Sequence, residues 1–226
     1  MKKSNIYLLS ILCSVSLFII MGALVSVARG KKSVEENAFY SSTPAYSHII
    51  LDNTNYKIGV KTADKYEFKL ALNKDEAKFD VPFEIKGDTL ILSKIPDDIE
   101  KKIKYVQLNL PEKNLEVQML SSNLNIDSYS GNTLKLDLDE SDLNILPEAI
   151  KKISKVEVNS RNKSTLRCYS NVAELQLNIN DSEFKALGSV DNVSGEIADK
   201  SYVYITNPGN TNLQKDADSK INYSYR

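Results

Sequence analysis

The sequence predicts an all-β protein built as a parallel β-helix, a β-solenoid in which short coils stack on one another. The first observation is a Ser-x-apolar triplet that recurs six times in the C-terminal half of the chain. The serines are separated by 19, 23, 18, 19 and 18 residues, and they are Ser122, Ser141, Ser164, Ser182, Ser201 and Ser219. A period near 20 residues is typical of stacked coils.

The second observation is an alternation of apolar and polar residues before most of these serines. The apolar members in two of the repeats are Leu134, Leu136 and Leu138 before Ser141, and Leu175, Leu177 and Ile179 before Ser182. Alternation with a period of two indicates a strand with one buried face. A repeat of about 19 residues that holds two or three strands has no room for a helix, so we expect coils stacked about 4.8 Å apart. We expect Leu136, Val158, Leu177 and Val203 to share one dry interior.

The composition fits a globular chain with a real core. Of 226 residues, 42% are hydrophobic and 26% are charged, and the net charge is -1. Nucleic-acid affinity depends on phosphate contacts from basic side chains, and no basic stripe occurs after residue 32. The composition therefore argues against a nucleic-acid partner.

Residues 1–32 form a segment of different composition. Two lysines precede an uncharged, mostly apolar run at residues 6–28, and three basic residues follow it. Because the run has 23 residues and a membrane span needs about 20, its length favours a retained transmembrane anchor. The alternative is a signal segment removed after Ala28, where Ser26-Val27-Ala28 fits a small-x-small cleavage site. Either reading places the body in the cell envelope, in the periplasm or at the cell surface, with the membrane as a partner through residues 6–28.

The rest of the chain divides into a linker at residues 33–46 and one β-helix domain at residues 47–226. The linker is expected because residues 33–46 show no sustained period and contain Ser-Ser-Thr-Pro. Strands are expected at residues 48–51, 56–60, 66–72, 79–85, 89–92, 105–110 and 115–119, with a turn at residues 86–88 and a short helical turn within residues 96–104. The 23-residue spacing is explained by a turn or short helix inserted near residues 146–155.

The repeated serines and the body cysteine have structural interpretations. Each serine is expected at a coil corner, where its hydroxyl bonds nearby backbone. Cys168 alternates with Leu166 and is expected to behave as a small buried hydrophobe. With Cys13 inside the apolar run, an intrachain disulfide is not expected. Asn222 and Tyr225 of the polar C-terminal segment suit the capping of an open sheet edge.

The chain resembles a known family over roughly residues 45–221. The resemblance is carried by KYVQLNLPEKNLEVQMLSSNLNI, NTLKLDLDESDLNI, NVAELQLNINDSEFKA and the closing DKSYVYITNPGNTNLQKDADSKI, and by FEIKGDTLIL at residues 83–92. These segments resemble the GIN-domain family, proposed adhesin head domains of autotransporters in exported bacterial proteins. The resemblance implies a right-handed parallel β-helix, and it brings no catalytic residues. Glycines that accompany the repeat serines in the family are sparse here.

The candidate contact residues are three acids and two tyrosines. Asp137 and Asp139 fall on the outer face of one expected strand and Asp142 follows the turn, so the three carboxylates could converge on Ca²⁺. The favoured interpretation is instead a solvated outer face, helped by Lys135, Lys155 and Glu157. Tyr129 and Tyr169 are candidates for an outer contact surface.

No catalytic site, cofactor site or metal site is expected. The single histidine, His48, lies in an expected strand near the start, and we interpret it as a surface or edge-strand residue. The function that follows is a non-enzymatic, adhesin-like, binding or scaffold β-helix of the cell envelope, with a glycan or an envelope protein as its partner. The alternatives are a polysaccharide-active enzyme, since 30 acids are available, and a membrane-anchored sensor subunit. The oligomeric state is left open.

Overall fold

The computed structural model describes residues 37–73, 76–79, 83–111, 114–127, 129, 131–147 and 152–225. These residues form a β-solenoid of strands with one short helix, α2 (Asp97–Glu100). The all-β prediction is confirmed, and the short helix lies inside the range expected for it. The apolar run at residues 6–28 and the cleavage site after Ala28 lie outside the described residues. Within the part of the chain that is described, no helix is long and apolar enough to cross a membrane.

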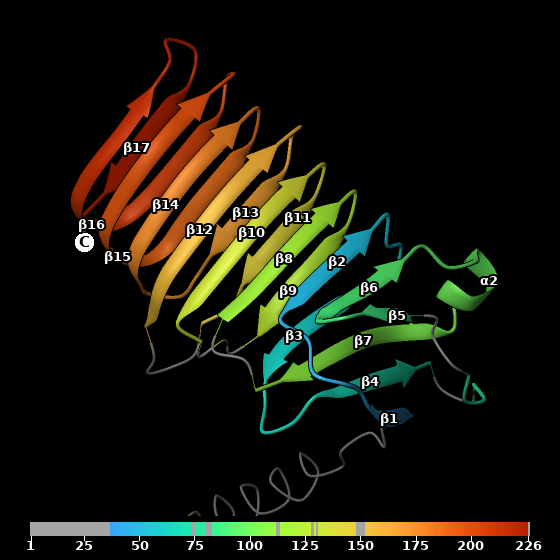
Figure 1. The fold of residues 1–226 in the computed structure, drawn as a ribbon. Coiled ribbons are helices and arrows are strands. Elements are labelled where there is room, and N and C mark those ends of the chain that lie inside the picture. The colour runs from blue at the N-terminus through green and yellow to red at the C-terminus, as the bar shows by residue number, and fades with distance from the viewer. Residues whose placement is uncertain are drawn as a thin grey trace, which may run out of the picture. The chain divides into compact units, whose positions relative to one another are not determined.

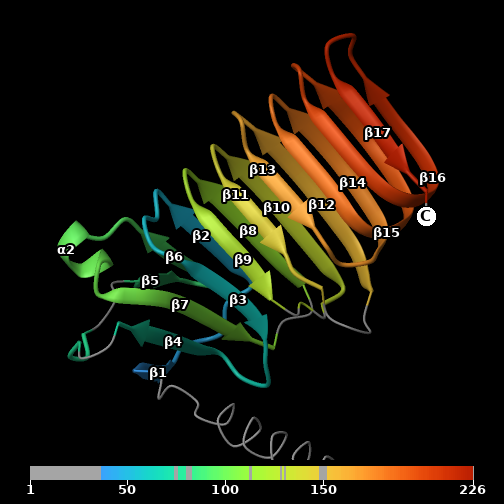
Figure 2. The same ribbon diagram turned by 180° about the vertical axis from the view of Figure 1, so that it is seen from behind.

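The strands of the stacked coils form two faces, and within each face neighbouring coils pair through parallel strands (Figure 1). The strands of the first face are β6 (Thr89–Ser93), β2 (His48–Asp52), β8 (Asn114–Leu120), β10 (Thr133–Asp139), β12 (Ile153–Arg161), β14 (Val172–Asn180) and the later halves of β15 (Glu183–Ala198) and β16 (Tyr202–Lys215). The strands of the second face, seen in Figure 2, are β7 (Ile103–Leu110), β3 (Ile58–Thr62), β9 (Asn123–Asp127), β11 (Asp142–Ile145), β13 (Thr165–Cys168), the early halves of β15 and β16, and β17 (Lys220–Ser224).

The spatial order of the coils departs from their order along the chain. The coil of β2 and β3 is made first, yet it lies between the coil of β6 and β7 and the coil of β8 and β9. His48 is accordingly in register with Thr89 on one side and with Glu116 on the other. The alternation of residues predicts each strand, but it contains no information on which strands become neighbours.

Antiparallel strands extend the two faces at the N-terminal end. On the second face β4 (Glu67–Leu72) pairs with β7, and β1 (Ala38–Ser42) pairs with β4. On the first face β5 (Phe83–Lys86) pairs with β6 through a turn at Gly87, whose φ of 64° is left-handed. The expected turn at residues 86–88 is confirmed. The linker expected at residues 33–46 is wrong for residues 38–42, because the pairing of β1 with a strand about 30 residues later leaves no local period.

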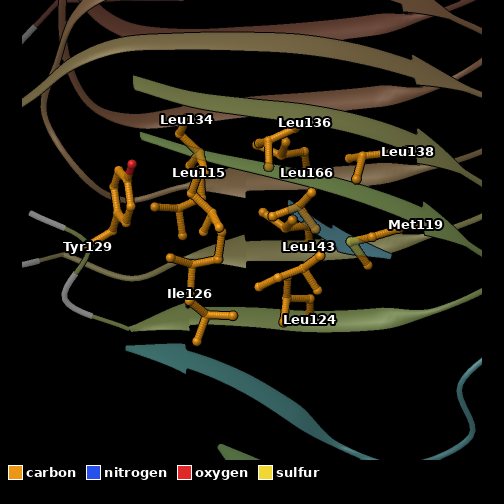
Figure 3. Packing of buried hydrophobic residues seen from close by; sticks show 14 of the residues in the cluster. Leu115, Met119, Leu124, Ile126, Tyr129, Leu134, Leu136, Leu138, Leu143 and Leu166 are labelled. Carbon is orange, nitrogen blue, oxygen red and sulfur yellow. The ribbon is translucent and has the colours of Figure 1, made fainter. Parts of the chain in front are cut away.

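The apolar residues of both faces meet in one interior. Leu136, Val158, Leu177 and Val203, which we expected to share it, are all 2% exposed or less and belong to one cluster. Figure 3 shows leucines of β8 and β10 packed against those of β9, β11 and β13. Cys168 is also buried, as expected.

The repeated serines form a hydrogen-bonded ladder at the coil corners. The Oγ of Ser141 donates to the carbonyl of Asp139 at 2.7 Å and accepts the N–H of Ser122 from the neighbouring coil at 3.1 Å. The N–H donors and Oγ acceptors that repeat the second contact are Thr54 with Ser122 (3.0 Å), Ser141 with Ser164 (3.0 Å), Ser182 with Ser201 (3.2 Å) and Ser201 with Ser219 (3.2 Å). The expected local bond is confirmed, and the hydroxyls also join the coils.

The corners use residues other than glycine at left-handed positions. The residue before five of the ladder serines has a left-handed φ, and the five are Ser121, Glu140, Lys163, Asp181 and Lys200, with φ between 43° and 63°. A left-handed non-glycine residue costs about 1–3 kcal/mol. The serine hydroxyl that satisfies a buried N–H offsets part of that strain, since an unsatisfied N–H costs a similar amount.

Candidate functional site

The acidic side chains predicted as a contact surface are paired within the first face. Arg161 of β12 lies in register with Asp139 of β10, and its Nε is 2.9 Å from Asp139 Oδ2. The Nη1 of Arg161 is 2.7 Å from Asp137 Oδ1, and Asn162 donates to Asp139 Oδ1 at 2.7 Å. The hydrogen bond from Asn162, followed by that of Arg161, lowers the pKa of Asp139 below its ordinary value. The two carboxylates therefore share one guanidinium, which offsets half of their charge.

Asp142 does not join the other two acids. It begins β11 on the second face, in register with Asn123 and Thr165, whereas Asp137 and Asp139 lie on the first face. Within the described ranges no group of three or more His, Cys, Asp or Glu side chains is placed to hold a metal ion. Lys155 pairs with Glu157 at 2.6 Å, and Lys135 lies 4.0 Å from the same carboxylate, as the solvated-face interpretation expects.

The two candidate tyrosines have opposite environments. Tyr169 is 40% exposed, so its expected outer position is confirmed. Tyr129 is only 2% exposed, and its expected place on a contact surface is wrong. Its hydroxyl donates to the carbonyl of Thr133 at 2.6 Å, which allows the ring to lie buried at the edge of the leucine cluster (Figure 3).

His48 of β2 contacts Asp88 in the turn before β6 and Glu116 of β8. Its Nδ1 is 3.0 Å from Asp88 Oδ2 and its Nε2 is 3.1 Å from Glu116 Oε2. The hydrogen bond of Ser47 to Asp88 (3.1 Å), followed by His48, lowers the pKa of Asp88. His48 is a surface residue as expected, but β2 is an internal strand, so the edge-strand alternative is wrong.

The contacts of His48 differ from those of a hydrolytic triad. Ser47 Oγ lies 3.4 Å from Nδ1, the same ring nitrogen that contacts Asp88. A triad requires the serine and the carboxylate on opposite ring nitrogens, so that one nitrogen accepts a proton while the other is held. Here Glu116 occupies the other nitrogen. The arrangement links strands and does not activate the serine.

A polar groove of about 720 Å³ lies over the second face, and we call it the second-face groove. Its floor consists of outward side chains from β9 and β11, and its walls come from the segment before β3 and from the junction of α2 with β7. The polar residues that line it are Thr54, Asn55, Lys57, Asn73, Glu100, Lys101, Lys104, Asn123, Asn125, Asp142 and Asn144.

Hydrogen bonds hold the floor and the walls of this groove. On the floor, Asn144 Nδ2 donates to Asn125 Oδ1 at 3.1 Å, which orders two amides on adjacent strands. One wall is held where Asn55 accepts the N–H of Ile95 and donates to its carbonyl, at 3.2 and 3.1 Å. In the other wall Asn73 Nδ2 donates to the carbonyl of Lys101 at 2.7 Å. The groove is thus preorganised by side-chain amides.

The lining defines what the groove can do. Amides offer both donors and acceptors, lysines offer charged donors, and Glu100 and Asp142 offer carboxylates. Among the described lining residues none is Ser, Cys or His. This combination suits a ligand with many hydroxyl groups, which both donate and accept hydrogen bonds.

The floor of the groove has a signal in the sequence that is separate from the alternation of apolar residues. This floor comes from SNLNI at residues 122–126 and SDLNI at residues 141–145, two near-identical repeats with polar side chains at the same outward positions. The walls have no such signal. They depend on contacts between residues about 30 to 40 positions apart, such as Asn73 with Lys101 and Asn55 with Ile95.

Comparisons with known proteins show the fold. No protein-family model and no curated protein matches this chain. The chain is similar to the solved structure of a proposed adhesin from Bacteroides fragilis, with a TM-score of 0.52 and 11% identity over 84% of this chain and 96% of that chain. It is also similar to a proposed lipid-binding protein from Parabacteroides distasonis, with a TM-score of 0.52 and 14% identity over 83% of this chain and 93% of that chain. At these identities the likeness establishes the architecture alone.

Proposed function

We propose that this protein is a non-enzymatic, adhesin-like binding protein of the cell envelope, and that it binds a glycan in the second-face groove. The observation that carries the proposal is the ordered floor, in which the amides of Asn125 and Asn144 are joined at 3.1 Å on adjacent strands. A glycan presents hydroxyls at regular intervals, and rigid strands are suited to fixing amides at such intervals. The names of the two solved neighbours support a binding role, although they belong to those proteins.

Attachment and family are further parts of the proposal. The 23-residue apolar run supports a membrane anchor that holds the body outside the cytoplasm. The quoted repeats support membership of the GIN-domain family and the right-handed winding that it implies. Protease added to cells with a permeabilised outer layer should digest the body, and complete protection would contradict the external location.

The binding test compares two matched pairs of asparagines. Isothermal titration of the full chain with the glycan selected from an array should show about tenfold weaker binding for Asn125→Ala with Asn144→Ala, the loss expected for one or two hydrogen bonds. The control is Asn159→Ala with Asn178→Ala, an equivalent pair of neighbours exposed on the first face. Equal binding by both double variants would remove the second-face groove as the glycan site.

A polysaccharide-active enzyme is the competing function, because Glu100 and Asp142 both line the groove. Glycoside cleavage requires two carboxylates in the roles of acid and base or nucleophile. Release of new reducing ends from envelope or plant polysaccharides, abolished by Glu100→Gln with Asp142→Asn, would overturn the non-enzymatic proposal. Binding without release supports it.

A further inference from the structure

The N-terminal end of the solenoid interior is closed by aromatic residues instead of by another coil. The inward positions of β4 and β1 extend the second face, and those of β5 extend the first face. Phe68 of β4 and Phe83 of β5 stack across the gap, with ring centroids 5.2 Å apart and an interplanar angle of 22°. Four of the six phenylalanines of the chain, Phe39, Phe68, Phe79 and Phe83, meet at this end.

A pocket of about 270 Å³ opens among these rings, and we call it the aromatic mouth. Its lining is mainly apolar and includes Leu70 and Phe68, which are buried, and Phe83, which is 39% exposed. Lys78 stands at the mouth with its Nζ 5.8 Å from the ring centroid of Phe39. An apolar pocket with a cation at its entrance suits a ligand with an apolar tail and an anionic head.

The position of the aromatic mouth in the sequence further restricts the class of ligand that it could bind. Strand β1, which lines the pocket, begins at residue 38, and the apolar run ends at residue 28. The nine residues between them can span at most about 30 Å when fully extended. Arg29, Lys31 and Lys32 lie in this short connection, and basic residues beside a membrane segment attract anionic lipids.

We propose that the aromatic mouth binds the end of one acyl chain of an anionic membrane lipid. Membrane attachment is the part of the proposed function on which this rests, and the second-face groove is not involved. The rings of Phe39, Phe68 and Phe83 would surround the tail, and Lys78 would face the phosphate of the head group. A pocket with the volume of about nine waters takes the end of a tail and not a whole lipid.

The test uses tryptophan as a unique reporter, because the chain has none. The full-length variants Phe83→Trp and Glu84→Trp are reconstituted into phosphatidylglycerol vesicles with brominated acyl chains, which quench tryptophan on contact. Residues 83 and 84 are neighbours on β5, and Phe83 lines the pocket whereas Glu84 does not. We expect quenching at least threefold stronger for Phe83→Trp. Circular dichroism confirms that both variants fold.

Added substitutions and a second ligand make the result specific. Ser41→Phe, which places a ring in the pocket, and Lys78→Glu should each reduce quenching of Phe83→Trp without changing that of Glu84→Trp. Equal quenching of both reporters, or none, would overturn the proposal. Quenching by free brominated stearic acid but not by vesicles would also overturn it, because the pocket would then take an acyl chain that does not come from the bilayer. Glycan binding is measured on the same samples, so the two proposals fail separately.

Discussion

The coils from Ser122 onward and the region from Ala38 to Leu110 use strands in two different ways. In the C-terminal coils each strand has a parallel neighbour of the same kind, and the serine contact recurs at most of the corners. The N-terminal region contains three antiparallel strands, a coil that is out of sequence order and a short helix. The second-face groove and the aromatic mouth both include residues of this irregular region. The irregular region contributes to these two cavities, whereas a further pocket of about 350 Å³ is lined by strands β12, β14, β15 and β16 of the regular coils.

The largest effect is expected from a charge in the coil interior. Leu177→Asp should unfold the protein, because an unpaired buried carboxylate costs several kcal/mol, a large share of the 5–15 kcal/mol that stabilises a typical domain. Leu177 is 1% exposed. The measurement is a thermal melt followed by circular dichroism, with Asn178→Asp on the exposed side of the same strand as the control. An unchanged midpoint for Leu177→Asp would contradict the assignment of the core.

Substitution of one glycine in each region compares how much space the two regions leave for a side chain. A Cβ on Gly195 would lie 1.8 Å from the carbonyl oxygen of Leu177 in the adjacent coil, whereas a Cβ on Gly87 in the hairpin meets no atom within 4 Å. Gly195→Ala should therefore destabilise by about 3 kcal/mol or more, and Gly87→Ala by about 1 kcal/mol, the cost of a left-handed conformation alone. Urea unfolding curves measure both. Equal losses would show that the coils can separate to admit a methyl group.

The serine ladder should have a smaller effect. Ser141→Ala removes the acceptor of the buried N–H of Ser122, and an unsatisfied buried donor costs about 1–3 kcal/mol. Ser194→Ala, at an exposed serine of β15, should change stability by less than about 0.5 kcal/mol. Urea unfolding again provides the measurement. If Ser141→Ala lowers the free energy of unfolding no more than Ser194→Ala does, the serine ladder does not contribute to stability.

The smallest expected effect is a pH dependence that both regions share. The pKa of Asp139 is lowered by Asn162 and Arg161, and the pKa of Asp88 is lowered by Ser47 and His48. A lowered folded pKa means that the stabilisation is fully present above the ordinary value near 3.8 and is lost as the pH falls through the lowered value. Melting temperatures between pH 5 and pH 2 should therefore fall less steeply for Asp139→Asn and for Asp88→Asn than for the unchanged protein. Parallel curves would show that these contacts do not stabilise the fold.

Periodicity accounts for what the sequence could predict. Strand alternation is a local signal, so the burial of Leu177 and the role of Ser141 at its corner were accessible from residues nearby in the chain. The burial of Tyr129 and the formation of strand β1 could not be predicted in this way. Tyr129 depends on the contact of its hydroxyl with a backbone carbonyl, and β1 depends on pairing with β4, and neither leaves a local period in the sequence. The acids illustrate the same limit. Asp137 and Asp139 were correctly placed on an outer face, but their pairing with Arg161 depends on the register between coils.

The candidate site was less predictable than the fold. The floor of the second-face groove follows from two repeats, whereas its walls require Asn55 and Asn73 to reach backbone about 30 to 40 residues away. The aromatic mouth likewise joins Phe68 to Phe83 across two faces. Such contacts arise only once the order of the coils is known.

The position of the β2–β3 coil has a consequence for how the chain reaches its native state. This coil is synthesised early, yet both of its flanking surfaces are supplied later, by β6 and β7 on one side and by β8 and β9 on the other. His48 meets Glu116 across 68 residues of sequence, and contacts of such long range slow folding. Both edges of the β2–β3 coil therefore remain unpaired until the later strands are available. The coils from Ser122 onward have neighbours that are consecutive in sequence, so we expect them to be able to assemble before the β2–β3 coil is paired.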